Sequence, residues 1–389
     1  MFFNVIISKK HVILLSFLLF SYLFIDTCVD TSCMISTPKD LDILGIDPSN
    51  FPQDIYILDN LSFIAHGYEG LLIYNISIPN ERELIGSYSD GGRVFDVFIK
   101  DSLAFLADRD DGLEIINISN PRNPVLINKF TAENFERYIS DLFIIDDLAF
   151  LIDYRDSLRI INATNPMHPF QISKCSLNNL CNNIFVANSF AYISSGSNGL
   201  EILNISDPFN PYKIANYSTE GSISNVFICK SFAYLTDYEM GLEVLDISNP
   251  ENPSKITYLK IEGNLTNIFV TNQFAFTSNV LNELFIINII NPLSPKIEKT
   301  FSFGSTAIFV SNNFLYIVPE YNSPYSTLNF RVFDISNINS IIEIFPHGFP
   351  PYDNRNILIL IGIIESILAT VLALIVTISI IRIFKKKNC

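Results

Sequence analysis

The stretch GLEIINISNPRNP at residues 112–124 recurs along the chain as GLEILNISDPFNP at 199–211 and as GLEVLDISNPENP at 241–253. Each copy combines an apolar run, an Asx-x-Ser triplet and two prolines at fixed spacing. Self-similarity at a period of about 20 to 50 residues is typical of repeat architectures. The number and the strand content of the copies therefore decide the fold.

Aligning the chain on the Asx position gives seven copies, spaced by 42, 45, 42, 42, 42 and 46 residues, at Asn75, Asn117, Asn162, Asn204, Asp246, Asn288 and Asp334. Each copy contains four short runs rich in Val, Ile, Phe and Tyr, separated by turn residues, which is typical of β-strands. Seven four-stranded units in a row predict an all-β fold, a seven-bladed β-propeller over residues 54–347. A linear β-solenoid is the alternative, although β-solenoids usually have shorter repeats.

At residues 232–256 the copy FAYLTDYEMGLEVLDISNPENPSKI resembles the repeat of the LVIVD family, which are cell-surface β-propellers of archaea and bacteria. The resemblance implies the propeller fold and a place at the cell surface, and it implies no particular activity. The first and last copies depart from the family pattern, because Pro79 is not followed by a second proline and NIN replaces the proline turn after Asp334.

The Asx-x-Ser triplet is interpreted as a turn element. Asp246 and Asp334 replace asparagine in two copies, and Asn and Asp share a side-chain oxygen that accepts a backbone N–H in turns. Sequons inside the repeat are then by-products of the turn. Three sequons break the repeat pattern and are the candidates for glycosylation: Asn60, Asn216 and Asn264.

Membrane signals are found at both ends of the chain. Lys9 and Lys10 precede an apolar run at residues 12–25, which predicts a signal peptide over residues 1–27, with an uncleaved signal anchor as the alternative. Residues 28–53 are interpreted as a linker. Within it, 41–47 resembles a fourth strand, and it is a candidate to close the ring in place of residues 340–346.

A second apolar segment, residues 357–381, is long enough for one transmembrane helix. It follows a short linker at 348–356 and precedes a basic tail at 382–389, which the positive-inside rule places in the cytoplasm. We therefore expect a single-pass type I protein of the cell membrane with an extracellular propeller.

Small side chains repeat at four-residue spacing within that segment, at Gly362, Ser366 and Thr370. Such spacing permits close approach of another helix, and a charge such as Glu365 is costly in the bilayer unless it is paired. Together they predict self-association, or association with another membrane protein. The alternative is a tilted helix whose Glu365 reaches the headgroups.

The start of the first strand of each copy carries a polar residue in all but the seventh copy, which has Ala307. If that strand lines the channel, these residues form a ring at one mouth: Asp54, Asp96, Asp141, Asn183, Asn225 and Asn267. By analogy with other propellers, such a ring is a candidate site for a cation or polar ligand. The alternative is that the Asx side chains cap strand starts.

Turns between the second and third strands are acidic in several copies. Asp108, Asp110 and Asp111 are candidate ligands for Ca²⁺, which prefers clustered oxygen atoms. An ordinary hairpin turn is the alternative, because the sequence contains no twelve-residue calcium loop. No other cofactor is expected.

Two cysteines, Cys175 and Cys181, flank a loop that the other copies lack, and we expect a disulfide between them in an oxidising exterior. Nucleophile-elbow and zinc-ligand motifs are missing from the sequence, so no catalytic residue is assigned.

The formal net charge of −15 argues against a nucleic-acid partner. These features favour a binding or adhesion module for a protein or glycan at the cell surface or envelope. The alternative is an extracellular hydrolase with an acidic or cation-dependent site at a channel mouth.

Overall fold

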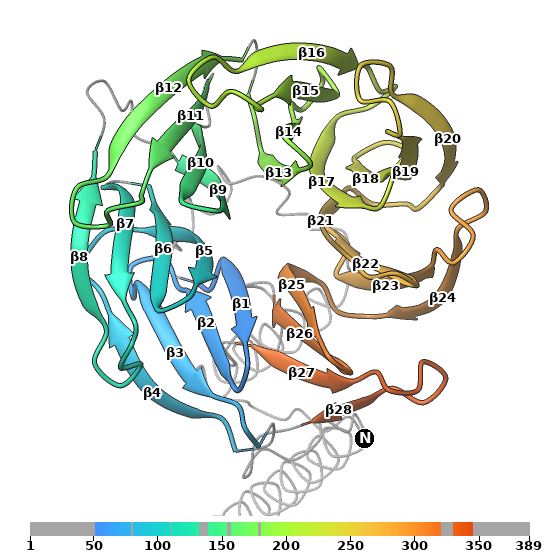
Figure 1. Cartoon of the computed structure of the whole chain (residues 1–389). Coiled ribbons are helices and arrows are strands. Elements are labelled where there is room, and N and C mark those ends of the chain that lie inside the picture. The colour runs from blue at the N-terminus through green and yellow to red at the C-terminus, as the bar shows by residue number, and fades with distance from the viewer. Residues whose placement is uncertain are drawn as a thin grey trace, which may run out of the picture. The chain divides into compact units, whose positions relative to one another are not determined.

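The structure, a computed structural model of the 389-residue chain, describes residues 51–78, 81–109, 111–131, 139–153, 157–177, 180–319 and 330–344. These residues form seven antiparallel sheets of four strands each, arranged around a central channel (Figure 1). The predicted seven-bladed β-propeller is thus confirmed. Both candidate membrane segments lie outside the described ranges, within which no helix is long and apolar enough to cross a membrane.

Each blade is a meander whose strands follow one another in sequence from the channel outward. Blade 1 contains β1 (Asp54–Leu58), β2 (Leu61–Ala65), β3 (Leu71–Asn75) and β4 (Glu83–Tyr88). Blade 2 contains β5 (Val94–Lys100), β6 (Leu103–Asp108), β7 (Gly112–Asn117) and β8 (Val125–Phe130). Blade 3 contains β9 (Ile139–Ile145), β10 (Leu148–Asp153), β11 (Ser157–Asn162) and β12 (Phe170–Ser176).

The other four blades repeat this order. Blade 4 contains β13 (Asn183–Ala187), β14 (Phe190–Ser194), β15 (Leu200–Asn204) and β16 (Tyr212–Tyr217). Blade 5 contains β17 (Ile223–Cys229), β18 (Phe232–Asp237), β19 (Gly241–Asp246) and β20 (Ser254–Leu259). Blade 6 contains β21 (Leu265–Val270), β22 (Phe274–Asn279), β23 (Glu283–Asn288) and β24 (Lys296–Phe301). Blade 7 contains β25 (Ser305–Ser311), β26 (Phe314–Pro319), β27 (Arg331–Asp334) and β28 (Ile342–Ile344).

The Asx turn that decided the fold is present in all seven blades. In each, the side-chain oxygen of the Asx residue accepts the backbone N–H two residues later, at 2.8 to 3.1 Å. Asp246 and Asp334 make the same bond as the asparagines. The interpretation of the triplet as a turn element is therefore confirmed.

The proline turn that follows the triplet packs on the outer strand of the preceding blade. Asn128 Nδ2 of blade 2 donates to the Met167 carbonyl of blade 3 at 2.8 Å, and Ser173 Oγ of blade 3 donates to the Pro208 carbonyl of blade 4 at 2.7 Å. At Gly86 in β4 the contact is so close that a Cβ atom would lie 2.0 Å from the Pro121 carbonyl oxygen. The recurring spacing of the turn is therefore used for packing between blades as well as for reversing the chain.

Hydrophobic packing is divided into seven clusters of buried residues, one at each junction between neighbouring blades. In every blade but the seventh, which has Leu315, the second strand carries a fully buried small residue such as Ala104, and the aromatic residue after it, such as Phe105, packs into the next junction. Alternating small and large side chains let twisted sheets meet closely. Most of the core therefore lies between blades.

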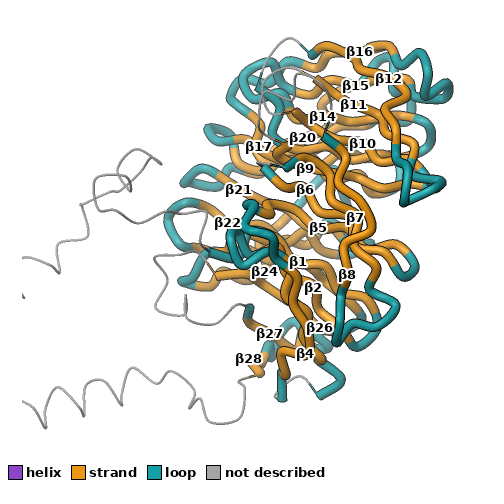
Figure 2. The backbone as a smooth tube through the Cα atoms, turned by 90° about the vertical axis from the view of Figure 1, so that its left-hand side faces the viewer, coloured by secondary structure: helices purple, strands orange, loops and turns teal. Residues whose placement is uncertain are grey.

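Ring closure by residues 41–47 stays a prediction, because these residues lie outside the described ranges. Among the described strands, the fourth strand of blade 7 is β28, from the same repeat as β25–β27. Blades 7 and 1 lie side by side (Figure 1, Figure 2), and their buried side chains form one hydrophobic cluster. Arg82 of blade 1 donates to the carbonyl oxygens of Phe330 and Ile344, and its guanidinium lies 4.9 Å from the centre of the Phe330 ring.

The predicted disulfide between Cys175 and Cys181 is corrected by the structure, in which both residues are thiols. Cys181 is buried, with its sulfur 3.5 Å from Ser195 Oγ, whereas Cys175 lies on the outer strand β12 opposite Leu158. A short separation along the chain does not bring two side chains together. Here Cys175 lies within β12 of blade 3, whereas Cys181 lies just before β13 of blade 4.

Candidate functional site: the central channel

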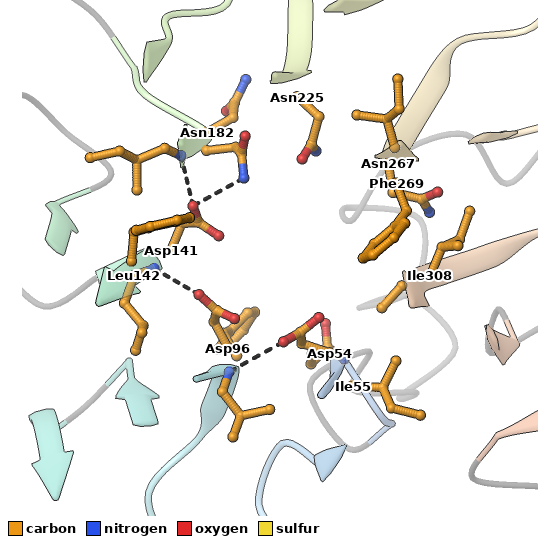
Figure 3. Close-up of a pocket in the computed structure, with 18 of the residues that line it drawn as sticks. Asp54, Ile55, Asp96, Asp141, Leu142, Asn182, Asn225, Asn267, Phe269 and Ile308 are labelled. Atoms are coloured by element: carbon orange, nitrogen blue, oxygen red, sulfur yellow. Dashed lines mark hydrogen bonds between the residues drawn. The ribbon is translucent and has the colours of Figure 1, made fainter. Parts of the chain in front are cut away.

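The first strand of every blade lines a central channel with a cavity of about 370 Å³. All six polar residues expected to ring one mouth contribute to its wall, in order around the axis, and Ala307 takes the seventh position. Figure 3 looks into this ring and labels the acidic side, Asp54, Asp96 and Asp141. The sequence therefore identified the channel lining correctly.

The acidic residues form hydrogen bonds that run from each blade to the next (Figure 3). In each case the side chain accepts the backbone N–H of the residue after the equivalent Asx position. The donors are Val97 to Asp54 at 3.3 Å, Leu142 to Asp96 at 2.7 Å, and Ile184 to Asp141 at 2.7 Å. The acidic side chains therefore do cap strand starts, as the alternative predicted, but each one caps a strand of the neighbouring blade.

Amide side chains continue the ring on the other side. Asn183 Oδ1 accepts the Val226 N–H at 3.0 Å, and Asn183 Nδ2 donates to Asp141 at 3.0 Å. Asn225 Nδ2 donates to the Thr266 carbonyl at 2.9 Å, and Asn267 Nδ2 donates to the Ser305 carbonyl at 2.5 Å. Between blades 7 and 1, Thr306 Oγ1 donates to the Pro52 carbonyl at 3.2 Å. Polar contacts therefore link every pair of neighbouring blades at this level.

Three adjacent carboxylates make one side of the ring electrostatically different. Burial, together with the neighbouring Asp96, raises the pKa of Asp54 and of Asp141 well above the usual range. Burial also raises the pKa of Asp96, although hydrogen bonds partly offset it. Like charges that share a poorly solvated space favour uptake of a proton or a cation. We call Asp54, Asp96 and Asp141 the acidic arc, and Asn183, Asn225 and Asn267 the amide arc.

A closed ring of seven aromatic side chains lies two residues further along the same strands: Tyr56, Phe98, Phe143, Phe185, Phe227, Phe269 and Phe309. Neighbouring ring centres are 4.8 to 5.5 Å apart, with interplanar angles of 48 to 53°. Tilted rings at this distance attract one another. The channel therefore has a polar layer and an aromatic layer, a combination that suits a small cation or a polar ligand with an apolar face.

Comparisons with known proteins identify the repeat. The LVIVD repeat family matches residues 91–132, 181–219 and 220–258, which correspond to blades 2, 4 and 5. The chain contains LVIVD repeats. No curated protein sequence matches it.

Solved structures similar to this LVIVD propeller share its fold at low sequence identity. The crystal structure of Saccharomyces cerevisiae Sqt1 matches with a TM-score of 0.60 at 10% identity, over 78% of this chain and 88% of that one. A functionally unknown protein from Desulfotomaculum acetoxidans matches with a TM-score of 0.59 at 14% identity, over 74% and 100%. BamB from Moraxella catarrhalis matches with a TM-score of 0.52 at 11% identity, over 77% and 84%. These likenesses show the fold alone.

The three blades that match the LVIVD family share a buried ion pair. A glutamate of the third strand pairs with a lysine of the fourth, in the pairs Glu114–Lys129, Glu201–Lys213 and Glu243–Lys255, at 3.2, 3.2 and 2.7 Å. All three glutamates are almost completely buried. In blade 7 of the LVIVD propeller the polarity is reversed, because buried Arg331 makes two hydrogen bonds of 2.6 Å to Glu343.

Blade 2 of the LVIVD propeller also gathers the acids expected to bind Ca²⁺. Oxygen atoms of Asp108 and Asp111 lie within 4.8 Å of each other and of oxygen atoms from Asp90 and Glu114, while Asp110 lies outside the described residues. Lys129 Nζ contacts Asp90 and lies 2.6 Å from Asp111 Oδ2. We call Asp90, Asp108, Asp111 and Glu114 the blade-2 cluster.

Charge within the blade-2 cluster is unevenly distributed. Burial, with Asp90 and Asp108 nearby, raises the pKa of Glu114 to about 8. Burial raises the pKa of Asp90, but hydrogen bonding, above all with Lys129, outweighs it and lowers the pKa to about 2. Sequence reasoning missed both residues. The recurring glutamate of GLEI was a signal for Glu114, whereas Asp90 follows another blade's last strand and had no such signal.

The remaining predicted site residues are separate from the channel. Asn60 and Asn264 lie in exposed turns and Asn216 lies exposed on β16, so all three candidate glycan acceptors are sterically accessible. The candidate residues for membrane association, Gly362, Glu365, Ser366 and Thr370, lie outside the described residues.

Proposed function

We propose that this chain is a binding module held at the cell surface, an LVIVD propeller that presents its turns to a protein or glycan partner. The observation that carries the proposal is the role of the acidic arc. Each of its carboxylates accepts a backbone N–H from the next blade. A side chain needed to join two blades is poorly placed for catalytic movement, so the acids favour an architectural role over a catalytic one.

An exposed apolar edge supports a protein partner. Many of the large exposed apolar side chains in the described part of the chain lie in the proline turns or at the start of the fourth strands. In blades 3 and 4 they are Met167, Phe170, Phe209 and Tyr212, with exposed fractions of 53 to 65%. Since Ser173 of β12 bonds to the Pro208 carbonyl, the fourth strand of blade 3 lies beside the proline turn of blade 4. Aromatic residues and methionine are enriched in protein interfaces.

The terminal segments complete the proposal. An export signal at residues 1–27 and a membrane helix at 357–381 would place the propeller outside a type I membrane protein, with Asn60, Asn216 and Asn264 open to glycosylation. The helix would also provide self-association through Gly362, Ser366 and Thr370, with Glu365 as the polar contact. Protease treatment of intact cells tests this topology, because an extracellular propeller is cut while the basic tail is protected.

Crosslinking the full-length chain in an envelope extract, followed by mass spectrometry, tests the binding function. We expect a saturable partner whose recovery falls when Met167 and Phe209 are both replaced by serine. The matched control replaces Val280 and Leu281, which are each 50% exposed and lie in a turn between second and third strands, at the opposite end of the sheet. Equal recovery with both double variants would contradict the apolar edge, and no saturable partner would contradict the binding function.

A hydrolase at the channel mouth is the second candidate, and the raised pKa values of Asp54, Asp96 and Asp141 favour it. A carboxyl group whose pKa is raised holds its proton more tightly and is therefore better suited to general acid catalysis. Asparagine at each of the three positions preserves an oxygen for the inter-blade bond. Turnover of a glycoside, ester or peptide substrate that is lost in this triple variant, while the fold persists, would support the enzyme.

A further inference from the structure

The blade-2 cluster has the spacing of a cation site. Oxygen atoms of its four members all lie within 4.8 Å of one another. A hard cation bound at about 2.3 to 2.6 Å from each oxygen requires oxygen atoms no further apart than about twice that distance. The cluster is also built from separate segments: Asp90 follows β4, Asp108 ends β6, Asp111 lies in the turn after it, and Glu114 lies within β7.

Glu114 provides an independent indication of a missing ligand. Its side chain is completely buried, and among the described residues no donor makes a hydrogen bond to either of its carboxylate oxygens. Lys129 Nζ lies 3.2 Å from Oε1, but this ammonium is shared with Asp90 and Asp111. A buried carboxylate that faces other carboxylates is costly unless it takes up a proton, toward which the pKa of about 8 for Glu114 points, or a cation.

Blade 5 shows the same position with one carboxylate oxygen left without a hydrogen-bond donor, compared with both oxygens of Glu114. Glu243, the counterpart of Glu114, accepts a hydrogen bond from Tyr217 Oη at 3.0 Å and pairs with Lys255 at 2.7 Å. The counterpart of Tyr217 is Tyr88, at the end of β4 in blade 1, which donates to Asp90 at 3.3 Å. The Tyr88 hydroxyl therefore donates to Asp90 and not to Glu114, and the Asp90 carboxylate adds a negative charge to the cluster.

We propose that the blade-2 cluster binds a divalent cation of the calcium type, for which Asp90, Asp108, Asp111 and Glu114 supply the oxygen ligands. Lys129 competes with the cation for the same carboxylates and turns away when the cation binds. Ca²⁺ accepts irregular sets of oxygen ligands, whereas Mg²⁺ demands an octahedral arrangement and retains its water. The bound cation joins the end of blade 1 to two segments of blade 2.

Calorimetric titration of the EDTA-treated full-length chain with CaCl₂, with thermal unfolding followed in parallel, tests the proposal. We expect one calcium site and a higher Tm with calcium. Asp90→Thr introduces the blade-5 residue at an exposed position and leaves the fold intact, and it should weaken binding by about 10-fold or more, as changes around metal sites do. Glu243→Gln in blade 5 is the matched control and should bind calcium as the unmodified chain does.

A Lys129→Gln variant separates a cation site from a purely internal ion pair. We expect it to bind calcium at least as tightly as the unmodified chain, and calcium should restore the Tm that the substitution lowers. The absence of a calcium heat at millimolar concentration would overturn the proposal. Equal weakening of calcium binding by Glu243→Gln would also overturn it, as would a Lys129→Gln variant whose Tm calcium does not raise. Tighter binding of MgCl₂ than of CaCl₂ would overturn the calcium type.

Discussion

The acidic arc and the amide arc of the channel perform the same structural task with different chemistry. Asp96 accepts the Leu142 N–H at 2.7 Å, and Asn183 accepts the Val226 N–H at 3.0 Å from the equivalent position. Asp96 raises the pKa of Asp54 and of Asp141, an effect that an amide side chain cannot have because it does not ionise. The fold therefore requires an acceptor at this position, and the negative charge is an additional property of blades 1 to 3.

Removing the acceptor should have the largest effect. Asn183→Ala leaves the Val226 N–H without its partner, which should lower the free energy of unfolding by about 1 to 3 kcal/mol. Chemical denaturation measures the loss. Asn183→Asp is the control, since it keeps the acceptor while it extends the acidic arc toward Asp141, and it should lose less near pH 5 than near pH 8. Equal losses for both variants at both pH values would contradict the capping role.

Removing only the charge should have a smaller effect of opposite sign. Asp96→Asn keeps an oxygen for the Leu142 N–H, as Asn183 does for Val226, and relieves repulsion from Asp54 and Asp141. We expect stability at pH 7 to rise by about 1 kcal/mol, the scale of a close charge pair in a well-screened environment. Thermal unfolding measures it. A clear loss of stability would show that the arc depends on its charge.

The acidic arc should also give the propeller a pH dependence. The folded pKa values of Asp54 and Asp141 lie above the value of 3.8 expected for the unfolded chain, so the folded state binds protons more tightly. The resulting stabilisation is fully present below pH 3.8 and is lost as pH rises through the folded pKa values. We expect a steeper decline with pH for the unmodified chain than for a variant with asparagine at all three positions. Parallel curves would contradict this assignment.

The aromatic layer should show the smallest effect, because both arcs share it. Tyr56 is its one tyrosine, and its ring lies 5.2 Å from Phe98 and 5.1 Å from Phe309, as the phenylalanines lie from one another. Tyr56→Phe should therefore change the free energy of unfolding by less than about 0.5 kcal/mol. A larger loss in thermal unfolding would mean that the hydroxyl has a specific role in the channel.

Sequence periodicity predicted the fold in detail because the same local physics acts seven times. The Asx turn needs only an oxygen acceptor two residues before an N–H, and that requirement is visible wherever Asn and Asp alternate, as at Asn204 and Asp246. The channel ring was equally visible, since a polar residue stands two positions before an aromatic residue in every first strand but that of blade 7. What repeats along the chain could be predicted.

Contacts between blades could not be read from one repeat. The strand capped by Asp141 begins in the next blade, and Asp90 meets Glu114 across a blade junction. The disulfide expectation failed for the same reason, because the directions of Cys175 and Cys181 depend on the strands around them. Relationships that span blades depend on a geometry that appears only when the ring is assembled.

The junction of blades 7 and 1, which Arg82 helps to close, is a mechanical weak point of the ring. Every sheet in the described part of the chain is drawn from one repeat, so the junction of blades 7 and 1 is held by side chains and by the guanidinium of Arg82 on two backbone carbonyls. No described strand bridges this junction, so a force applied between the first and last strands would part these two blades sideways. The ring would then open as a chain of seven intact blades before any sheet is unfolded.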